Sequence, residues 1–169
     1  MAARTSLRDY QRELAERLKS AETGRFSSKL GLQVGGAGWL VDLQEASEMI
    51  PVPAITPVPL TKPWFRGLSN IRGNLYTVVD LPAFLGGAPI TLNEHARLLL
   101  VGERFRMLAA LLVERSLGLR NPEHFREVGA DAEPAAWTRK QYEDPEGRQW
   151  KELDLPQLVQ HPEFLSVSL

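Results

Sequence analysis

One pattern occurs twice in the chain and constrains its fold more than any other feature. Residues 79–82 (Val-Asp-Leu-Pro) match residues 153–156 (Leu-Asp-Leu-Pro), and residues 32–35 (Leu-Gln-Val-Gly) match residues 99–102 (Leu-Leu-Val-Gly). In the first pair, an apolar strand delivers an aspartate to the start of a short helix, where its carboxylate accepts backbone N–H groups and proline sets the helical φ. The repetition predicts two small β-units packed together, each closed or nearly closed so that its strand edges are protected.

The rest of the chain is also dominated by signals for strands and turns. Apolar residues alternate with polar or small residues, and turn residues divide the runs into three predicted hairpins, over 30–43, 96–113 and 136–155. A β-branched run at 75–81 predicts a further, buried strand. Five prolines in 51–63 remove ladder donors and fix φ, so this segment is expected to be an extended surface connection, either a stiff loop or a peptide-type docking surface. Residues 121–134 are polar and predict a loop. The fold class is therefore mainly β, with short helices after strands.

The first 24 residues differ from the rest of the chain. Apolar side chains recur there at helical spacing, at Leu7, Tyr10, Leu14, Leu18 and Ala21. Gly24 follows as a stop signal. This predicts an amphipathic helical extension over 1–24 and a β domain over 25–169. The apolar stripe of the helix has two interpretations, because it could pack on the body of the domain or dock onto a partner.

Charge and cysteine content argue against several classes of function. The 20 basic and 21 acidic residues leave no net field that would draw the protein to nucleic acid or to an anionic bilayer. The chain has no cysteine, which excludes disulfides and thiolate metal sites and is compatible with a reducing cytosol. No apolar stretch approaches the ~20 residues of a membrane span, and the N-terminus lacks the apolar core of a secretory signal. We therefore expect a soluble protein, retained in the cell and not inserted into a membrane.

Residues 64–74 combine two glycines, two asparagines and two arginines just before the buried strand, and predict a turn-rich, charged tip. Such a tip on a rigid strand suits recognition of another protein better than it suits chemistry. The Arg72 guanidinium is a planar fork of donors that can bind a carboxylate or backbone carbonyls of a partner, or else tie its own loop to a nearby acid. Gly67 and Gly73 permit tight turns and close backbone approach. Asn70 is expected to stabilise the turn through its side chain.

This tip also carries a family resemblance. Residues 67–73 (Gly-Leu-Ser-Asn-Ile-Arg-Gly), followed by a strand ending in Asp80-Leu81, resemble the signature of the CheW-like family of chemotaxis coupling proteins. The resemblance extends from about residue 26 to the C-terminus. The predicted N-terminal helix, the sequence of 64–73 and the tail at 161–165 further resemble the PilI type, which serves the chemosensory system that controls type IV pili and twitching motility.

The resemblance implies two small β-barrel subdomains and a non-catalytic role. Members of the family link the cytoplasmic tips of chemoreceptors to a CheA-type sensor histidine kinase. A cytoplasmic protein recruited to membrane-bound receptor arrays is therefore implied, with no cofactor. The resemblance also implies that Arg72 takes part in receptor and kinase coupling and that Glu48 lies on the kinase-facing surface. Leu43 and Ala46 are expected on that same surface.

Two residues depart from the family pattern. Thr77 stands where proline is usual, and Glu114 stands where aspartate is common. Thr77 is β-branched and should be tolerated within a strand. Glu114 is longer by one methylene and is expected to alter a local cap or contact. Both departures leave the turn at Arg72 intact.

Two other classes of function remain as alternatives. An enzyme has little support, because the three histidines are far apart and no nucleophile elbow, phosphate-binding loop or dinucleotide fingerprint occurs, so no catalytic, cofactor-binding or metal residues are predicted. A β-barrel that binds nucleic acid could use the four tryptophans for stacking, but Arg104-Phe105-Arg106 is a short cationic patch for phosphates. Core packing explains most of the tryptophans better.

Overall fold

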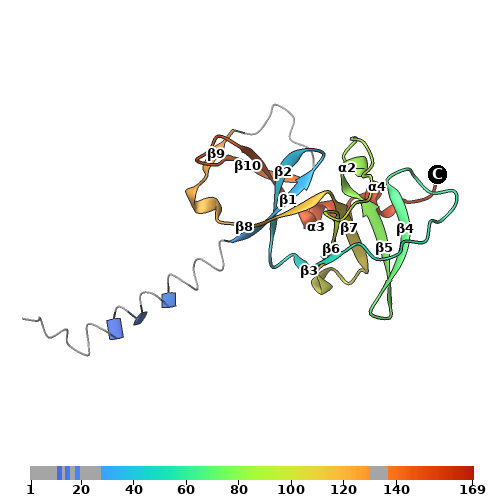
Figure 1. Ribbon diagram of the computed structural model, residues 1–169, viewed down its shortest axis with the longest axis horizontal. Helices are drawn as coiled ribbons and strands as arrows, with labels where there is room; N and C mark the ends of the chain where they lie inside the picture. The colour runs from blue at the N-terminus through green and yellow to red at the C-terminus, as the bar shows by residue number, and fades with distance from the viewer. Residues whose placement is uncertain (1–10, 13, 16–17, 20–27, 130–136) are drawn as a thin grey trace, which may run out of the picture.

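The computed structural model describes residues 28–129 and 137–169, together with residues 11–12, 14–15 and 18–19. Two β-sheets pack against each other in this part of the chain, with short helices at their junction (Figure 1). The six-stranded sheet has the order β8 (Arg115–Arg120), β1 (Lys29–Val34), β2 (Ala37–Asp42), β11 (Gln149–Leu153), β10 (Thr138–Glu143), β9 (Arg126–Val128). The five-stranded sheet has the order β3 (Ala46–Pro51), β6 (Arg97–Val101), β7 (Ala109–Val113), β5 (Asn74–Asp80), β4 (Phe65–Ile71). The predicted mainly β fold of two packed units is confirmed.

Both sheets are built on the same plan. Each contains an antiparallel hairpin, β1–β2 in one and β6–β7 in the other, and all three predicted hairpins form. Beside each of these two hairpins lies, in parallel, the strand that leads into Asp-Leu-Pro: β11 beside β2 and β5 beside β7. Each sheet also takes its edge strand from the chain that leaves the other sheet, because β3 follows β2 but pairs with β6, and β8 follows β7 but pairs with β1. The sequence repeat is thus a structural repeat with exchanged edge strands.

Short helices follow the two parallel strands, as the repeat predicts. The Asp80 carboxylate accepts the N–H of Ala83 at the start of α2 (Leu81–Phe84), and the Asp154 carboxylate accepts the N–H of Gln157 at the start of α3 (Leu155–Gln160). A further helix, α4 (Pro162–Leu165), follows α3. Two short 3₁₀ helices, η1 (Glu103–Phe105) and η2 (Pro122–His124), lie in connections.

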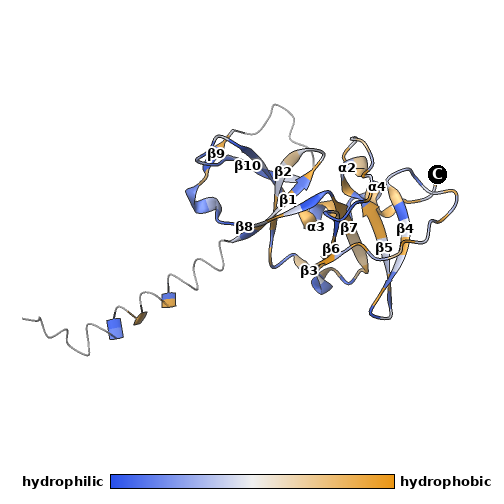
Figure 2. Cartoon of the chain, viewed as in Figure 1, coloured by the Kyte–Doolittle hydropathy of each residue, from blue (hydrophilic) through white to orange (hydrophobic). Residues whose placement is uncertain are grey.

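The hydrophobic core has two parts. A shared core joins the two sheets and the helices, and it includes Val41 of β2, Leu111 of β7 and Leu158 of α3. A second cluster, which includes Leu98 and Leu112, belongs to the five-stranded sheet and its connections. Figure 2 shows the contrast, since β5 and β7 are largely hydrophobic whereas β9 and β10 are hydrophilic.

Neither sheet is a closed barrel in the described part of the chain, because the strands at the ends of each sheet do not pair with each other. The five-stranded sheet nevertheless curls. The chain after β3 reaches β4 through a β-bridge between Thr56 and Leu68, so the second apolar cluster is wrapped on several sides. The proline-rich segment at 51–63 is mostly extended connection, as predicted.

Three segments differ from the sequence-based expectation. Residues 65–71 form strand β4 rather than part of a turn-rich tip, because the alternation of buried and more exposed side chains there has period two. Strand β9 forms within the predicted loop at 121–134, and β8 was not predicted. The residues of both strands are mostly exposed. β9 has a single apolar residue, Val128, and the alternation in β8 is limited to Leu117 and Leu119, which is too short to mark a strand by itself.

The predicted N-terminal extension over 1–24 lies mostly outside the described residues. Positions 11–12, 14–15 and 18–19 are helical, and Leu14 and Leu18 are exposed. The domain boundary at residue 25 stays a prediction. Within the described residues, no helix has the length and apolar character needed to cross a membrane.

Candidate protein-docking site

Arg72 and Gly73 form the two-residue turn between β4 and β5. Their φ angles are 53° and 85°, and positive φ at both central residues is what a type I′ hairpin turn requires. The Asn70 side-chain oxygen accepts the N–H of Gly73 at 2.9 Å, so Asn70 stabilises the turn as the sequence predicts. The turn therefore holds the Arg72 side chain on a fixed backbone.

Gly67 lies several residues from this turn, where β4 meets the chain that follows β3. Its φ is 128°, and a Cβ atom there would lie 2.1 Å from the Thr56 carbonyl oxygen. Thr56 and Leu68 exchange two backbone hydrogen bonds beside it, of 2.7 and 2.9 Å. Gly67 thus permits close backbone approach, as predicted, but within the scaffold rather than at the tip.

The Arg72 guanidinium forms a bidentate ion pair with Glu48 of β3. Nη1 donates to Oε2 at 2.7 Å and Nη2 donates to Oε1 at 2.6 Å. The hydrogen bonds from Arg72 lower the pKa of the Glu48 carboxyl, and the same bonds raise the pKa of Arg72. The Arg72 side chain remains 68% exposed, so water screens the pair and a partner could replace either member at little cost. Two predicted site residues, 24 positions apart, therefore meet.

Leu43 and Ala46 precede Glu48 along the chain. Leu43 lies in the turn between β2 and β3 and is exposed, whereas Ala46 starts β3 and packs partly against the shared core. Ala46 therefore offers less side-chain surface to a partner than Leu43 does. We call the surface that carries the ion pair between Glu48 and Arg72 the Glu48–Arg72 edge. That Leu43 and Ala46 belong to this surface stays a prediction.

A network of partly buried charges lies behind this edge. Glu45 pairs with Arg139 of β10 at 2.6 Å, and Arg139 also pairs with Asp154 at 3.1 Å. Burial opposes the charge of Arg139, but the hydrogen bonds that it donates to Glu45 and Asp154 prevail and raise its pKa. Glu152 of β11 pairs with Lys29 of β1 at 2.9 Å. No pattern in the sequence predicts this network, because its members are distant in the chain and belong to no motif.

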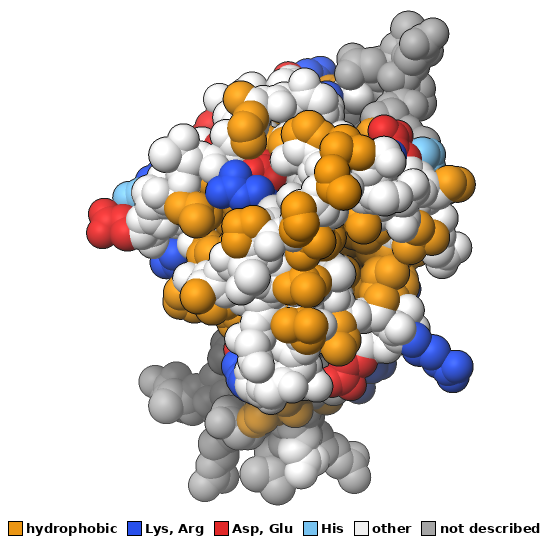
Figure 3. All heavy atoms as spheres, turned by 90° about the vertical axis from the view of Figure 1, so that its right-hand side faces the viewer, with side chains coloured by type: hydrophobic (Ala, Val, Ile, Leu, Met, Phe, Trp, Pro, Cys, Tyr) orange, Lys and Arg blue, Asp and Glu red, His pale blue; other side chains and the backbone are white. Residues whose placement is uncertain are grey.

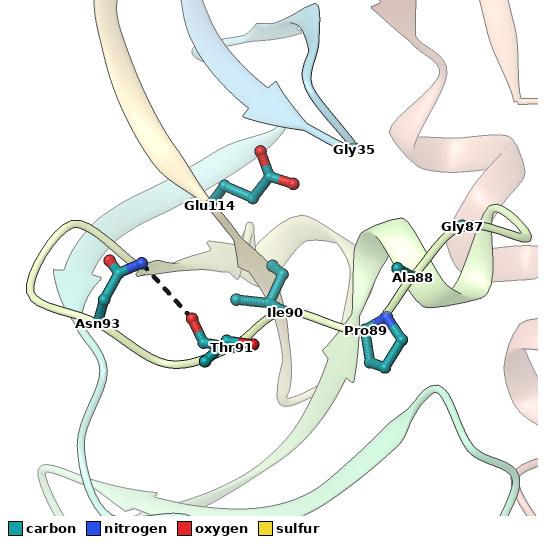
Figure 4. A pocket seen from close by; sticks show the side chains of 8 residues that line it. All are labelled: Gly35, Gly87, Ala88, Pro89, Ile90, Thr91, Asn93 and Glu114. Atoms are coloured by element: carbon teal, nitrogen blue, oxygen red, sulfur yellow. Dashed lines mark hydrogen bonds between the residues drawn. The ribbon is translucent and has the colours of Figure 1, made fainter.

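A surface hollow of about 440 Å³ lies where the two sheets meet (Figure 4). It is lined by Gly35 of the β1–β2 turn, by the connection after α2 and by Glu114, which joins β7 to β8. The Glu114 carboxylate accepts the N–H of Gly36 at 3.3 Å. That the longer side chain alters a local contact relative to aspartate stays a prediction. Thr77, the other departure from the family pattern, lies within β5.

An apolar face lies on another side of the molecule, over the connection between β3 and β4 and the C-terminus. Hydrophobic side chains gather there (Figure 3). Leu60 is 79% exposed and Leu169 is 81% exposed, and the N–H of Leu169 donates to the Leu60 carbonyl at 3.1 Å. Leu60 also has φ of 60°, which an L-amino acid with a branched side chain rarely adopts. Part of this face is the proline-rich segment at 51–63, for which the sequence left a stiff loop and a docking surface as alternatives, and the choice between them stays open.

The described residues include no group of three or more His, Asp or Glu side chains that could hold a metal ion. The buried carboxylates have structural partners. Asp80, which is fully buried, accepts the N–H of Ile90 at 2.9 Å and pairs with Arg66 at 3.2 Å. The arrangement at the Glu48–Arg72 edge offers hydrogen bonds, charge and some apolar surface, which are the means of protein recognition.

Comparisons with known proteins agree with this architecture. The CheW-like domain family matches residues 29–163, so the chain belongs to the CheW-like family, whose members are non-catalytic scaffold or adaptor proteins. The chain is 28% identical over 148 residues to Protein PilI of Pseudomonas aeruginosa, covering 84% of this chain and 80% of that protein. Its fold is similar to that of the scaffolding protein TtCheW from Thermoanaerobacter tengcongensis, with a TM-score of 0.62 and 16% sequence identity over 75% of this chain and 88% of the other.

Proposed function

We propose that this protein couples the cytoplasmic tips of chemoreceptors to a CheA-type sensor histidine kinase in the pathway that controls type IV pilus twitching motility. The observation that carries the proposal is the exposed Glu48–Arg72 pair, held by a hairpin turn and an edge strand of a rigid sheet. Membership of the CheW-like family and similarity to PilI support it.

The mechanism is positional. Arg72 and Glu48 satisfy each other in the free protein, and each can bind a group of opposite charge on the kinase without leaving an unpaired buried charge behind. The neighbouring Leu43 adds apolar contact at the same edge. A modest interface is sufficient, because a receptor array multiplies weak contacts through effective concentration.

An adaptor needs a second surface for the receptor. The hollow beside Glu114 lies at the junction of the two sheets and combines apolar walls, such as Ile90, with polar groups such as Asn93. It is built from elements other than those of the Glu48–Arg72 edge. We assign the receptor tip to this hollow and the kinase to the edge, so that both partners can bind one molecule. The protein would then lie in the cytoplasm, recruited to membrane-bound arrays.

Reconstitution tests the proposal. The protein is mixed with the kinase and a receptor signalling domain, and binding to each partner and kinase autophosphorylation are measured. Arg72→Glu should weaken kinase binding at least tenfold, because it places two carboxylates together at the edge. Arg126→Glu is the matched control, since Arg126 is 72% exposed and pairs with Glu143 on the other sheet. Failure of the wild-type protein to bind either partner would overturn the proposal.

The pathway is tested in cells. Expression of this chain in a Pseudomonas aeruginosa strain that lacks PilI should restore the zone of twitching, and the Arg72→Glu variant should not. Restoration of swimming in a strain that lacks its flagellar CheW protein, without any effect on twitching, would contradict the assignment to the pilus pathway.

A further inference from the structure

Glu45 is the last residue of the turn between β2 and β3, at the point where the chain passes from the six-stranded to the five-stranded sheet. It is only 4% exposed, although exposed Leu43 lies two residues before it. A buried carboxylate is costly unless it is paired. No step of the proposed function uses this residue, so its burial beside the Glu48–Arg72 edge needs an explanation.

The side chain of Glu45 is held by the six-stranded sheet. Its Oε1 accepts from Nη2 of Arg139 at 2.6 Å, and Nε of Arg139 lies 3.1 Å from the Asp154 carboxylate that caps α3. Arg104, which is half exposed, lies 4.0 Å from the same Glu45 oxygen. The other oxygen, Oε2, is buried and has no hydrogen-bond partner in the described part of the chain. The position of the Glu45 side chain therefore depends chiefly on Arg139.

The backbone of Glu45 is held by the five-stranded sheet. Its carbonyl oxygen accepts the N–H of Gly102, which follows β6, at 2.9 Å. The two backbones are so close that a Cβ atom on Gly102 would lie 2.7 Å from this oxygen. The N–H of Glu45 donates to the Asp42 carbonyl at 3.0 Å and closes the turn. One residue is thus fixed from both sheets.

We propose that Glu45 is a positioning residue for the Glu48–Arg72 edge, joining Arg139 of one sheet and Gly102 of the other so that β3 starts at a fixed place. The start of β3 sets where Glu48 lies relative to Arg72, because Glu48 follows Glu45 by only three residues and pairs with Leu100 of β6 directly after the β-bulge between Ala46 and Glu48. This inference rests on the proposed function, in which the kinase binds the edge. Glu45 itself need not touch the kinase.

Two variants disturb the position of Glu45 in independent ways. Glu45→Gln keeps the size of the side chain and removes its charge, and Gly102→Ala pushes on the Glu45 carbonyl from the opposite side. Glu127→Gln is the matched control, because it removes an exposed ion pair with Lys140, 2.9 Å long, on the same six-stranded sheet. Phe164→Leu, in the aromatic cluster around Trp64 and Phe84, is a control for lost stability alone.

All four variants are compared with the wild type by three measurements: thermal unfolding, the NMR resonances of the Ser47 amide and the Glu48 carboxyl, and affinity for the kinase well below the unfolding temperature. We expect Glu45→Gln and Gly102→Ala to shift both resonances and to weaken kinase binding by about tenfold. Glu127→Gln and Phe164→Leu should leave both resonances and the affinity at wild-type values, although Phe164→Leu lowers the unfolding temperature.

The outcomes separate this inference from the proposed function. Unchanged Ser47 and Glu48 resonances in Glu45→Gln overturn the positioning role, whether or not the kinase binds. Equal loss of affinity in Phe164→Leu also overturns it, because stability alone would then account for the effect. If the two variants shift both resonances but the wild-type protein does not bind the kinase, the positioning role is supported and the proposed function is overturned.

Discussion

The two sheets share one connectivity but fill their interiors with opposite chemistry. Val78 of β5 and Glu152 of β11 occupy equivalent places, each two residues before the aspartate that caps a helix. Val78 is fully buried in the apolar cluster of the five-stranded sheet. Glu152 is 5% exposed and pairs with Lys29, and its carboxylate accepts the hydroxyl of Tyr142 at 3.1 Å. Burial and this carboxylate raise the pKa of Tyr142.

The comparison shows what the fold requires and what it leaves open. The connectivity requires a hairpin, a parallel strand and a capped helix, and both halves have them. It leaves open how the inner face is filled, because an apolar cluster tolerates many shapes whereas an ion pair needs a partner of fixed geometry. The edge proposed to bind the kinase is built on the apolar half, and the charged half holds its β2–β3 turn through Arg139.

Introducing a charge into the apolar half should have the largest effect. Val78→Glu places a carboxylate inside an apolar cluster and should cost about 4 kcal/mol or more of unfolding free energy. Much of the 5–15 kcal/mol typical of a domain would be lost. Urea unfolding measures the change. If Val78→Glu unfolds at the same urea concentration as the wild type, the interior of the five-stranded sheet admits water or charge as readily as the interior of the six-stranded sheet.

The reverse exchange in the charged half should cost less. Glu152→Val removes the nearer carboxylate from Lys29, so that Asp42 at 3.6 Å is its remaining ion-pair partner among the described residues, and leaves the Tyr142 hydroxyl without this acceptor. We expect a loss of about 3 kcal/mol, measured by the same unfolding experiment. The double variant with Lys29→Met should recover part of this loss, because the unpaired charge is removed. A double variant less stable than Glu152→Val would contradict this account of the network.

The two aspartates that cap helices should also differ in their contribution to stability, with the larger loss in the five-stranded half. Asp80 is fully buried and accepts the N–H groups of Ala83 and Ile90, so Asp80→Ala should cost about 3 kcal/mol. Asp154 is 15% exposed, caps the N–H of Gln157 and pairs with Arg139, which keeps Glu45 as a partner, so Asp154→Ala should cost less, about 1–2 kcal/mol. Thermal unfolding of both variants tests the order. Equal costs would show that burial does not distinguish the two caps.

Relief of backbone strain at Leu60 should change stability less, and in the opposite direction, as a gain. Leu60 has φ of 60° and its side chain is 79% exposed, so Leu60→Asn should raise stability by about 1 kcal/mol because asparagine adopts this conformation more readily. The backbone hydrogen bond from Leu169 to the Leu60 carbonyl is retained. A lower unfolding temperature would mean that the leucine side chain packs more than its exposure indicates.

The smallest expected effect is on the titration of Glu48. Because Arg72 lowers the pKa of this carboxyl in the folded protein, the pair contributes stability above the ordinary glutamate pKa of 4.5, and that contribution is lost as the pH falls through the lowered value. Carboxyl NMR should show Glu48 titrating below 4.5 in the wild type and returning toward it in Arg72→Gln. An unchanged titration would mean that the ion pair is not formed in solution.

The local features of this protein follow from neighbouring residues, and sequence reasoning found them. The caps at Asp80 and Asp154, the hairpin over 30–43 and the turn at Arg72 each depend on a few adjacent positions. The nature of β4 was missed because glycines and polar residues suggested turns, whereas Gly67 permits the close approach to Thr56 within a strand. The roles of the predicted site residues in binding stay predictions.

Alternation, turns and caps determined by themselves that the chain would form two similar β-units with an arginine at a tight turn. Only the tertiary structure decided that β3 and β8 exchange sheets, that Arg72 meets Glu48 and that Glu45 meets Arg139 across 94 positions. The physical reason is the distance along the chain over which each kind of interaction acts. Backbone propensities act over a few residues, but an exposed edge strand fits either sheet, and the choice depends on which side chains the whole fold brings together.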